Sequence, residues 1–251
     1  MYLFATIPAI ILFIVIWSLD NTEKEPAGLL IKLFLGGALT VISAVLAGLL
    51  GDKLLGLFYK GTKPLLFIFI DSFIFSALVQ EAGKFFVLKR ITWKNREFNY
   101  TFDGVVYAVS VSLGYTVLEN IVYAVAGGGD ASIMRVILSA TGHILFAVFM
   151  GYFYGLARYT GGAGDIKAER RYIAEAFFVP VFLNGFYIFC LKCDNIVFTV
   201  LLAVYEVILL VVGVWRFIML SREDMIIPGM EWTTLKEDDK TWEVGDDEGK
   251  M

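Results

Sequence analysis

The chain has 251 residues, of which 58% are hydrophobic and only 18% are charged. A soluble domain has about 45–50% apolar and about 25% charged residues, so a single soluble core cannot absorb this excess. The net charge of −4 argues against a nucleic-acid partner, and two cysteines are too few for a disulfide scaffold. The composition therefore predicts a polytopic membrane protein.

Seven stretches of the sequence are long and apolar enough to cross a bilayer, which takes about 20 helical residues. None of them alternates as a barrel strand does, so we expect an all-α, polytopic transmembrane helical bundle. The expected spans are residues 2–19, 29–50, 64–88, 105–126, 133–157, 172–191 and 196–220. The first is followed by acidic residues rather than a cleavage site, which predicts a retained anchor helix. Residues 52–63 mix leucines with lysines and are expected to form a short interfacial amphipathic segment.

The basic residues near the span ends predict how the chain is oriented. With seven spans, twelve Lys and Arg residues fall on one side of the membrane and five on the other. Because the cytoplasmic side carries the excess, the N-terminus is expected outside and the C-terminus inside. Residues 1–228 would form the membrane domain. Residues 229–251, with eight acidic residues and three lysines, would form a disordered acidic cytoplasmic tail.

Several spans contain polar groups that hydrocarbon disfavours. A charge at the bilayer centre costs at least about 2.5–3.5 kcal/mol, so such residues are functional candidates. The candidates are Asp71, Gln80, Glu81, Lys84, Glu119, Asn120, His143, Asn184 and Glu206. Glycines that allow close helix approach lie on or beside the same spans, at positions 104, 114, 142, 151 and 185.

The spacing of these groups predicts one shared site. Glu81 and Lys84 are three residues apart and can pair on one helix face. Three spans can then direct Glu81, Glu119 and the only histidine, His143, to one point. At about 1.5 Å per residue, Glu81 lies about 25 Å from the start of its span, so this helix is expected to run past Leu88.

Two carboxylates and an imidazole in a dry cavity suit hydrolysis. One carboxylate can take a proton from water, and the imidazole can donate one to a leaving group or stabilise an oxyanion. The same Glu81, Glu119 and His143 could instead hold a divalent metal such as zinc. Structural pairing, or a path for ions or protons, remains as an alternative.

Other catalytic signatures fit poorly. There is no His-Glu-x-x-His motif and no Gly-x-Ser-Gly motif, which excludes zinc proteases with the first motif and argues against serine proteases of the rhomboid type. Residues 127–130 spell Gly-x-Gly-Asp, but the second candidate aspartate, Asp103, falls at the opposite side of the membrane. Cys190 and Cys193 form a single C-x-x-C motif, which is either a redox pair or two membrane-edge cysteines without a role.

The motifs between about residues 67 and 189 resemble the PrsW family of intramembrane proteases, in a superfamily that includes the CAAX prenyl endopeptidases. The segment from Gln80 to Lys84 resembles the family's E-E-x-x-K motif, and Tyr115 with Glu119 resembles its F-x-x-x-E motif. His143 lies in a stretch that resembles its histidine helix. The segment Asn184-Gly-Phe-Tyr-Ile188 resembles its final H-G-x-Y-D element.

The resemblance implies roles for these residues, with three departures from the family pattern. Gln80 replaces a glutamate, Asn184 a histidine and Ile188 an aspartate. The implied roles of Glu81 and Glu119 are those of an acid/base or metal-binding pair, with His143 as proton donor or ligand. Asn184 would donate a hydrogen bond to the oxyanion, and Lys84 would set the charge of Glu81. Gln80 and Asn120 would support water or substrate.

The expected function is therefore that of an intramembrane endopeptidase. The resemblance implies a prokaryotic cell membrane and a single-span, anti-sigma-factor-like substrate cut during stress signalling. The alternatives are an inactive pseudoprotease that binds single-span partners, and a proton-coupled transporter that uses Glu119 and His143. The transporter is disfavoured because the two halves share no pattern of broken helices.

Overall fold

The computed structural model of the chain describes residues 14, 24–59, 61–126 and 133–230, without the side chains of residues 133–138. The predicted first span, the Gly-x-Gly-Asp stretch and residues 231–251 of the predicted tail lie outside this part. The described part contains helices and no strand beyond one isolated bridge. The elements are α2 (Ala27–Leu55), α3 (Leu65–Ile70), η1 (Asp71–Leu78), α4 (Val79–Thr92), α5 (Asp103–Ala126), α6 (Ile133–Gly162), α7 (Ile166–Lys192) and α8 (Ile196–Arg222).

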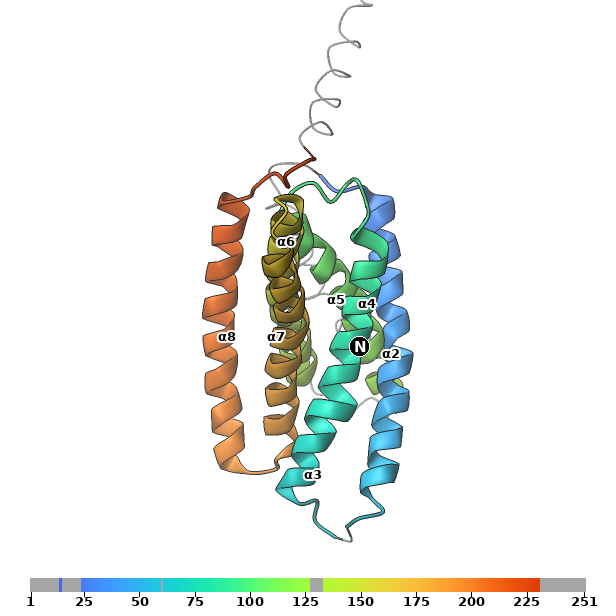
Figure 1. The fold of residues 1–251 in the computed structure, drawn as a ribbon. Helices are drawn as coiled ribbons and strands as arrows, with labels where there is room; N and C mark the ends of the chain where they lie inside the picture. Colours follow the sequence, from blue (N-terminus) through green and yellow to red (C-terminus); the bar gives the residue numbers. More distant parts are fainter. Residues whose placement is uncertain (1–13, 15–23, 60, 127–132, 231–251) are drawn as a thin grey trace, which may run out of the picture.

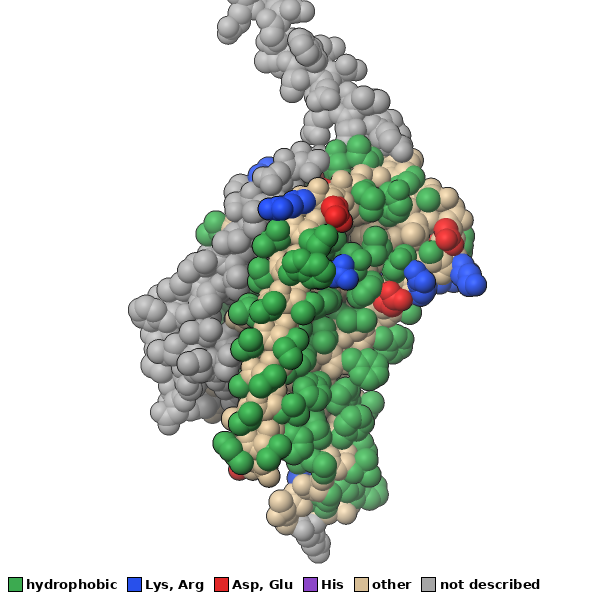
Figure 2. Space-filling model, turned by 90° about the vertical axis from the view of Figure 1, so that its left-hand side faces the viewer, with side chains coloured by type: hydrophobic (Ala, Val, Ile, Leu, Met, Phe, Trp, Pro, Cys, Tyr) green, Lys and Arg blue, Asp and Glu red, His purple; other side chains and the backbone are tan. Residues whose placement is uncertain are grey.

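The predicted helical bundle is confirmed, with six helices in the described residues that are long and apolar enough to cross a membrane. They lie side by side along one axis, and the ends of α4 and α8 lie at the same end of the bundle as the start of α2 (Figure 1). Figure 2 shows hydrophobic side chains over most of one long face, with most charged side chains gathered toward one end. This is the surface expected of a protein whose solvent is lipid.

The least apolar spans are the most buried ones. α5 and the described span of α6 have mean hydropathies of 1.5 and 1.4, and 78% and 72% of an 18-residue window in each is buried. For α2 and α8 the mean hydropathies are 2.3 and 2.7, and only 17% is buried. The apolar helices therefore form the lipid-facing wall, and polar groups are collected on the helices inside.

Small residues bring α5 into backbone contact with α2 and with α6, as predicted for most of the glycines. A Cβ on Gly114 of α5 would overlap the carbonyl oxygen of Phe34 in α2. A Cβ on Gly104 would lie 2.7 Å from the carbonyl oxygen of Gly151 in α6. Gly142 differs, because its Cβ would meet its nearest neighbour, the Phe146 ring, at an ordinary 3.6 Å. Close approach at the other sites replaces the hydrophobic driving force that helices lack in lipid.

The third predicted span is one continuous helical segment with a wide turn in it. α3 and α4 are joined by η1, a π-helical stretch, and the segment ends at Thr92. The prediction that this helix runs past Leu88 is confirmed. The prediction for residues 52–63 needs correction: residues 52–55 extend α2, and the chain then turns, with Gly61 at a positive φ of 96°.

A cluster of ion pairs ties the far end of the bundle together. Lys63 Nζ lies 3.0 Å from an oxygen of Asp52 and 2.9 Å from one of Asp71, which also accepts a bond from Lys192 at 3.1 Å. Partial burial lowers the pKa of Lys63, but hydrogen bonds to Asp71 and Asp52 outweigh it and leave this pKa raised. Asp71, predicted as an ionisable group within a span, is thus a structural anchor between η1 and α7.

The chain after α8 folds back onto the α4–α5 loop. The Thr101 amide donates to the Met225 carbonyl at 3.0 Å, and the Ile227 amide donates to Asn99 at 2.7 Å. Ile227 is buried in the main core. The described end of the chain, through Met230, is therefore packed onto the membrane domain.

We expect Gly114→Ala to destabilise the bundle, because the new methyl group meets the α2 backbone. Overpacking of this kind costs about 1–3 kcal/mol. Gly48→Ala is the matched control, since nothing lies within 4 Å of its Cβ position and alanine favours the helix by up to about 1 kcal/mol. Thermal unfolding of the purified variants in detergent measures the difference. Equal melting temperatures would contradict the proposed packing.

Candidate active site

Polar side chains of four helices, most of them predicted candidates, meet in one buried network. α4 contributes Gln80, Glu81 and Lys84, α5 contributes Tyr115 and Glu119, α6 contributes Ser139 and His143, and α7 contributes Asn184. Glu81 is 1% exposed and Lys84 2%, and Glu119 and His143 are 8% and 6% exposed. The structure therefore brings together Glu81, Glu119 and His143 as the sequence predicted.

Glu81 is held by donors from its own helix and from α7. Lys84 Nζ donates to Oε1 of Glu81 at 2.6 Å, and Asn184 Nδ2 donates to the same oxygen at 2.7 Å. Asn184 Nδ2 also donates to the side-chain oxygen of Gln80 at 2.9 Å. The i,i+3 spacing of Glu81 and Lys84 makes their pairing possible within one turn of α4. Gln80 acts through Asn184, whose amide it orients.

Lys84 connects the two halves of the network. Its Nζ lies 3.4 Å from Nδ1 of His143 and 5.0 Å from the centre of the Tyr115 ring. An ammonium group only donates, so a charged Lys84 makes Nδ1 of His143 the acceptor and leaves the ring proton on Nε2. Nε2 lies 3.0 Å from Oε2 of Glu119. The imidazole is therefore held between a cation and a carboxylate.

Glu119 has donors on both oxygens. Tyr115 OH donates to Oε1 at 3.1 Å, and Ser139 Oγ donates to Oε2 at 3.3 Å. Ser112 Oγ donates to the backbone carbonyl of His143 at 2.9 Å, which fixes α6 against α5. Sequence reasoning did not single out Ser139 or Ser112. The spacing of four residues between Ser139 and His143, which puts both on one helix face, is the signal that could have found Ser139.

Two buried polar atoms of the network have no hydrogen-bond partner in the described structure. They are Oε2 of Glu81 and Oδ1 of Asn184. An unsatisfied buried polar atom costs about 1–3 kcal/mol, so such atoms are explained best by a ligand or water that completes them. The two side chains are joined to each other, because Asn184 Nδ2 donates to Oε1 of Glu81. Their unpartnered atoms therefore mark the part of the network where a reacting molecule would bind.

Other residues that the sequence analysis singled out lie outside the network. Asn120 is buried, but no hydrogen bond of the described residues joins it to Glu119 or His143, and its Nδ2 is unpartnered. Ile188 packs in a small apolar cluster between α6, α7 and α8. Glu206 is 9% exposed, and its Oε1, which has no partner, lies 3.9 Å from the Cβ position of Gly142. Cys190 and Cys193 are buried and free.

The donor set does not fit a divalent metal as it is arranged. No group of three or more His, Cys, Asp and Glu side chains in the described residues is placed to hold an ion. Both ring nitrogens of His143 face other partners, and the ammonium of Lys84 lies between this ring and Glu81. Metal binding by Glu81, Glu119 and His143 would require Lys84 to leave this position.

The fold and the buried carboxylate–imidazole network define an integral membrane protein whose site suits hydrolysis. The sequence profile of the family described as PrsW family intramembrane metalloprotease matches residues 25–215. The chain belongs to this family, and it is an intramembrane protease of bacterial type.

Curated relatives agree with this assignment. Protease PrsW of Geobacillus kaustophilus is 33% identical over 187 residues, which cover 72% of this chain and 74% of the relative. Protease PrsW of Oceanobacillus iheyensis is 31% identical over 211 residues, or 83% and 90% of the two chains. The Clostridioides difficile protein of the same name is 31% identical over 214 residues, or 83% and 86%. No solved structure matches the chain.

We expect the purified chain to hold no stoichiometric zinc, because Lys84 supplies the positive charge between Glu81 and His143. Lys84→Met removes that charge and leaves two carboxylates and an imidazole, so it is expected to bind zinc more tightly than the unaltered chain. Elemental analysis after dialysis against zinc measures both proteins. Stoichiometric zinc in the unaltered chain, lost in His143→Ala, would contradict this reading of the site.

Proposed function

We propose that the chain hydrolyses a peptide bond of a single-span membrane protein, with Glu81 as the base that activates water. The observation that carries this proposal is the free Oε2 of Glu81 within a buried network. Both oxygens of Glu119 already accept hydrogen bonds, which leaves Glu81 as the carboxylate with room for a water molecule. Lys84 Nζ lies 2.6 Å from the other oxygen of Glu81 and pairs with it there.

His143 and Glu119 complete the proposed proton path. A proton leaves water for Glu81 as the oxygen attacks the peptide carbonyl. The proton that Glu81 takes from water passes by way of Lys84, which contacts both Oε1 of Glu81 and Nδ1 of His143, to this ring nitrogen. From Nδ1 it is donated to the leaving nitrogen when the C–N bond breaks, and the ring returns to its neutral form with its proton on Nε2. Glu119 on Nε2 stabilises the imidazolium form, and Tyr115 fixes Glu119. All steps use groups of this chain.

Asn184 is the proposed donor to the oxyanion. Its Nδ2 now donates to Gln80 and Glu81, and a substrate carbonyl could take one of these two hydrogen bonds. An amide can donate to an oxyanion but cannot carry a proton, which suits the replacement of a histidine at this position. Asn120 has an unpartnered buried Nδ2 one residue from Glu119, and we assign it a supporting contact to the substrate.

The proposed substrate and orientation follow from the family and from charge. The relatives are named Protease PrsW, and the family resemblance points to a single-span anti-sigma-factor-like substrate within the bilayer. The basic residues gather at the membrane side where α4 and α8 end, which supports a cytoplasmic C-terminus and an outer N-terminus.

Glu81→Ala, Glu119→Ala and His143→Ala are each expected to lower cleavage by at least about 100-fold, because each removes a group that carries a proton or holds the imidazole that does. Cleavage of a tagged single-span substrate, reconstituted with the protease in liposomes, measures the loss. Glu206→Gln is the matched control, since Glu206 is a buried carboxyl group outside the network. If all three variants cleave normally, the site is assigned wrongly.

A second candidate function is that of a binder that holds single-span partners without cutting them. Gln80, which cannot act as a base, favours it. We expect the unaltered chain to cleave, with Gln80→Glu changing the rate but not creating the activity. Cleavage seen only in Gln80→Glu would instead indicate a disabled protease. No cleavage by either form, with a partner still retained on affinity capture, would favour the binder.

A further inference from the structure

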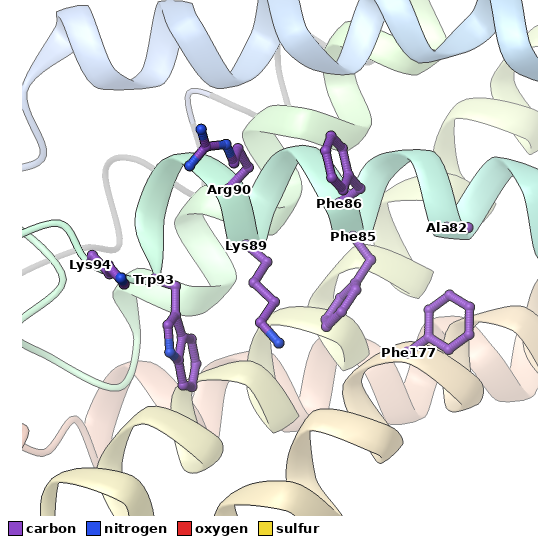
Figure 3. Close-up of a pocket in the computed structure, with 8 residues that line it drawn as sticks. All are labelled: Ala82, Phe85, Phe86, Lys89, Arg90, Trp93, Lys94 and Phe177. Carbon is purple, nitrogen blue, oxygen red and sulfur yellow. The ribbon is translucent and has the colours of Figure 1, made fainter.

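A groove on the lipid-facing surface between α4 and α7 lies outside the network. Its volume is about 750 Å³, and its wall follows α4 from Ala82 and continues past the end of this helix to Trp93 and Lys94 (Figure 3). Phe177 of α7 forms the opposite wall. The α4 residues recur at helical spacing, so they form one stripe along the helix, about 16 Å long from Ala82 to Trp93.

One end of the groove is cationic. Lys89, Arg90 and Lys94 line it, and all three are exposed. No ion pair of the described residues joins any of them to a carboxylate, whereas Arg171 at the start of α7 lies 3.6 Å from Glu175. Three neighbouring positive charges without a counter-charge favour an anionic ligand.

The rest of the groove is apolar and aromatic. The Phe85 and Phe177 rings are tilted by 51° with centroids 5.6 Å apart, and Lys89 Nζ lies 5.7 Å from the centre of the Trp93 ring. Arg158 lies against the same Trp93 ring at 5.7 Å, and its buried Nε has no hydrogen-bond partner. A fourth positive charge therefore stands next to the cationic end, with a donor still unsatisfied.

We propose that this groove binds an anionic phospholipid, with the phosphate on Lys89, Arg90 and Lys94 and an acyl chain along the aromatic wall toward Ala82. A soluble anion would use the charges but would leave the 16 Å apolar stripe uncovered, whereas a lipid matches both parts. Basic pockets between membrane helices on the cytoplasmic side bind anionic head groups in this way. The inference uses the cytoplasmic placement of this end, which is part of the orientation proposed above, and it is independent of the catalytic assignment.

Brominated lipids test the proposal, because bromine on an acyl chain quenches a tryptophan that it touches. The reporter variant is F85W/W93F, which places an indole on the apolar part of the groove. It is reconstituted with dibrominated phosphatidylglycerol or with dibrominated phosphatidylcholine of the same chains, and the difference from W93F isolates the signal of this indole. We expect phosphatidylglycerol to quench it more strongly. In K89Q/R90Q/K94Q, we expect the apparent affinity to fall by at least about tenfold.

The matched control is K167Q/R170Q/R222Q, which removes three exposed charges from the same end of the bundle but from outside the groove. This control is expected to keep the preference for phosphatidylglycerol, and K89R/K94R is expected to keep it as well. Equal quenching by the two lipids would overturn the proposal. Equal losses in the two triple variants, or competition by inorganic phosphate, would also overturn it.

Discussion

The ammonium group of Lys84 is the interaction on which the interior of this bundle depends. Two carboxylates, Glu81 and Glu119, lie within a protein whose surroundings are hydrocarbon, and a buried carboxylate is tolerated only when it is paired and hydrogen-bonded. Lys84 pairs directly with Glu81 and reaches Glu119 through the imidazole of His143. The Lys84 ammonium thus connects α4, α5 and α6. Its position sets the tautomer of the His143 ring and leaves Oε2 of Glu81 without a partner.

The burial of the site restricts the access of water and substrate to it. The ionisable groups are nearly inaccessible, so water and a peptide reach them only if neighbouring helices separate. Glu81 belongs to α4 and Asn184 to α7, and the groove at Ala82 lies between the same two helices. A lipid in that groove would lie beside the contact between α4 and α7, which has to open for a peptide to enter. Lipid composition and proteolysis would then be linked through one pair of helices.

Much of this arrangement could be predicted from the sequence, because hydrocarbon leaves few options. Apolar runs of about 20 residues must be helices, and Glu81, Glu119 and His143 on separate helices avoid lipid by facing one another. The partners of Asp71, the serine bonds and the contact of Lys84 with His143 could not be predicted in this way. They depend on side-chain reach and on helix rotation, which apolar patterns do not fix.

The π-helical turn η1 determines which way the half of the helix that carries Glu81 and Lys84 faces. Asp71 at its start must meet Lys63 and Lys192, while Glu81 and Lys84 beyond it must face α6 and α7. One residue corresponds to about 100° of rotation in an α-helix. The wide π-helical turn therefore lets Asp71 and the Glu81–Lys84 pair both face their partners, which a regular helix would not allow. Losing a single residue here would turn Glu81 and Lys84 away from their partners and leave every motif in the sequence intact. In this stretch, the length of the chain matters more than the identity of its side chains.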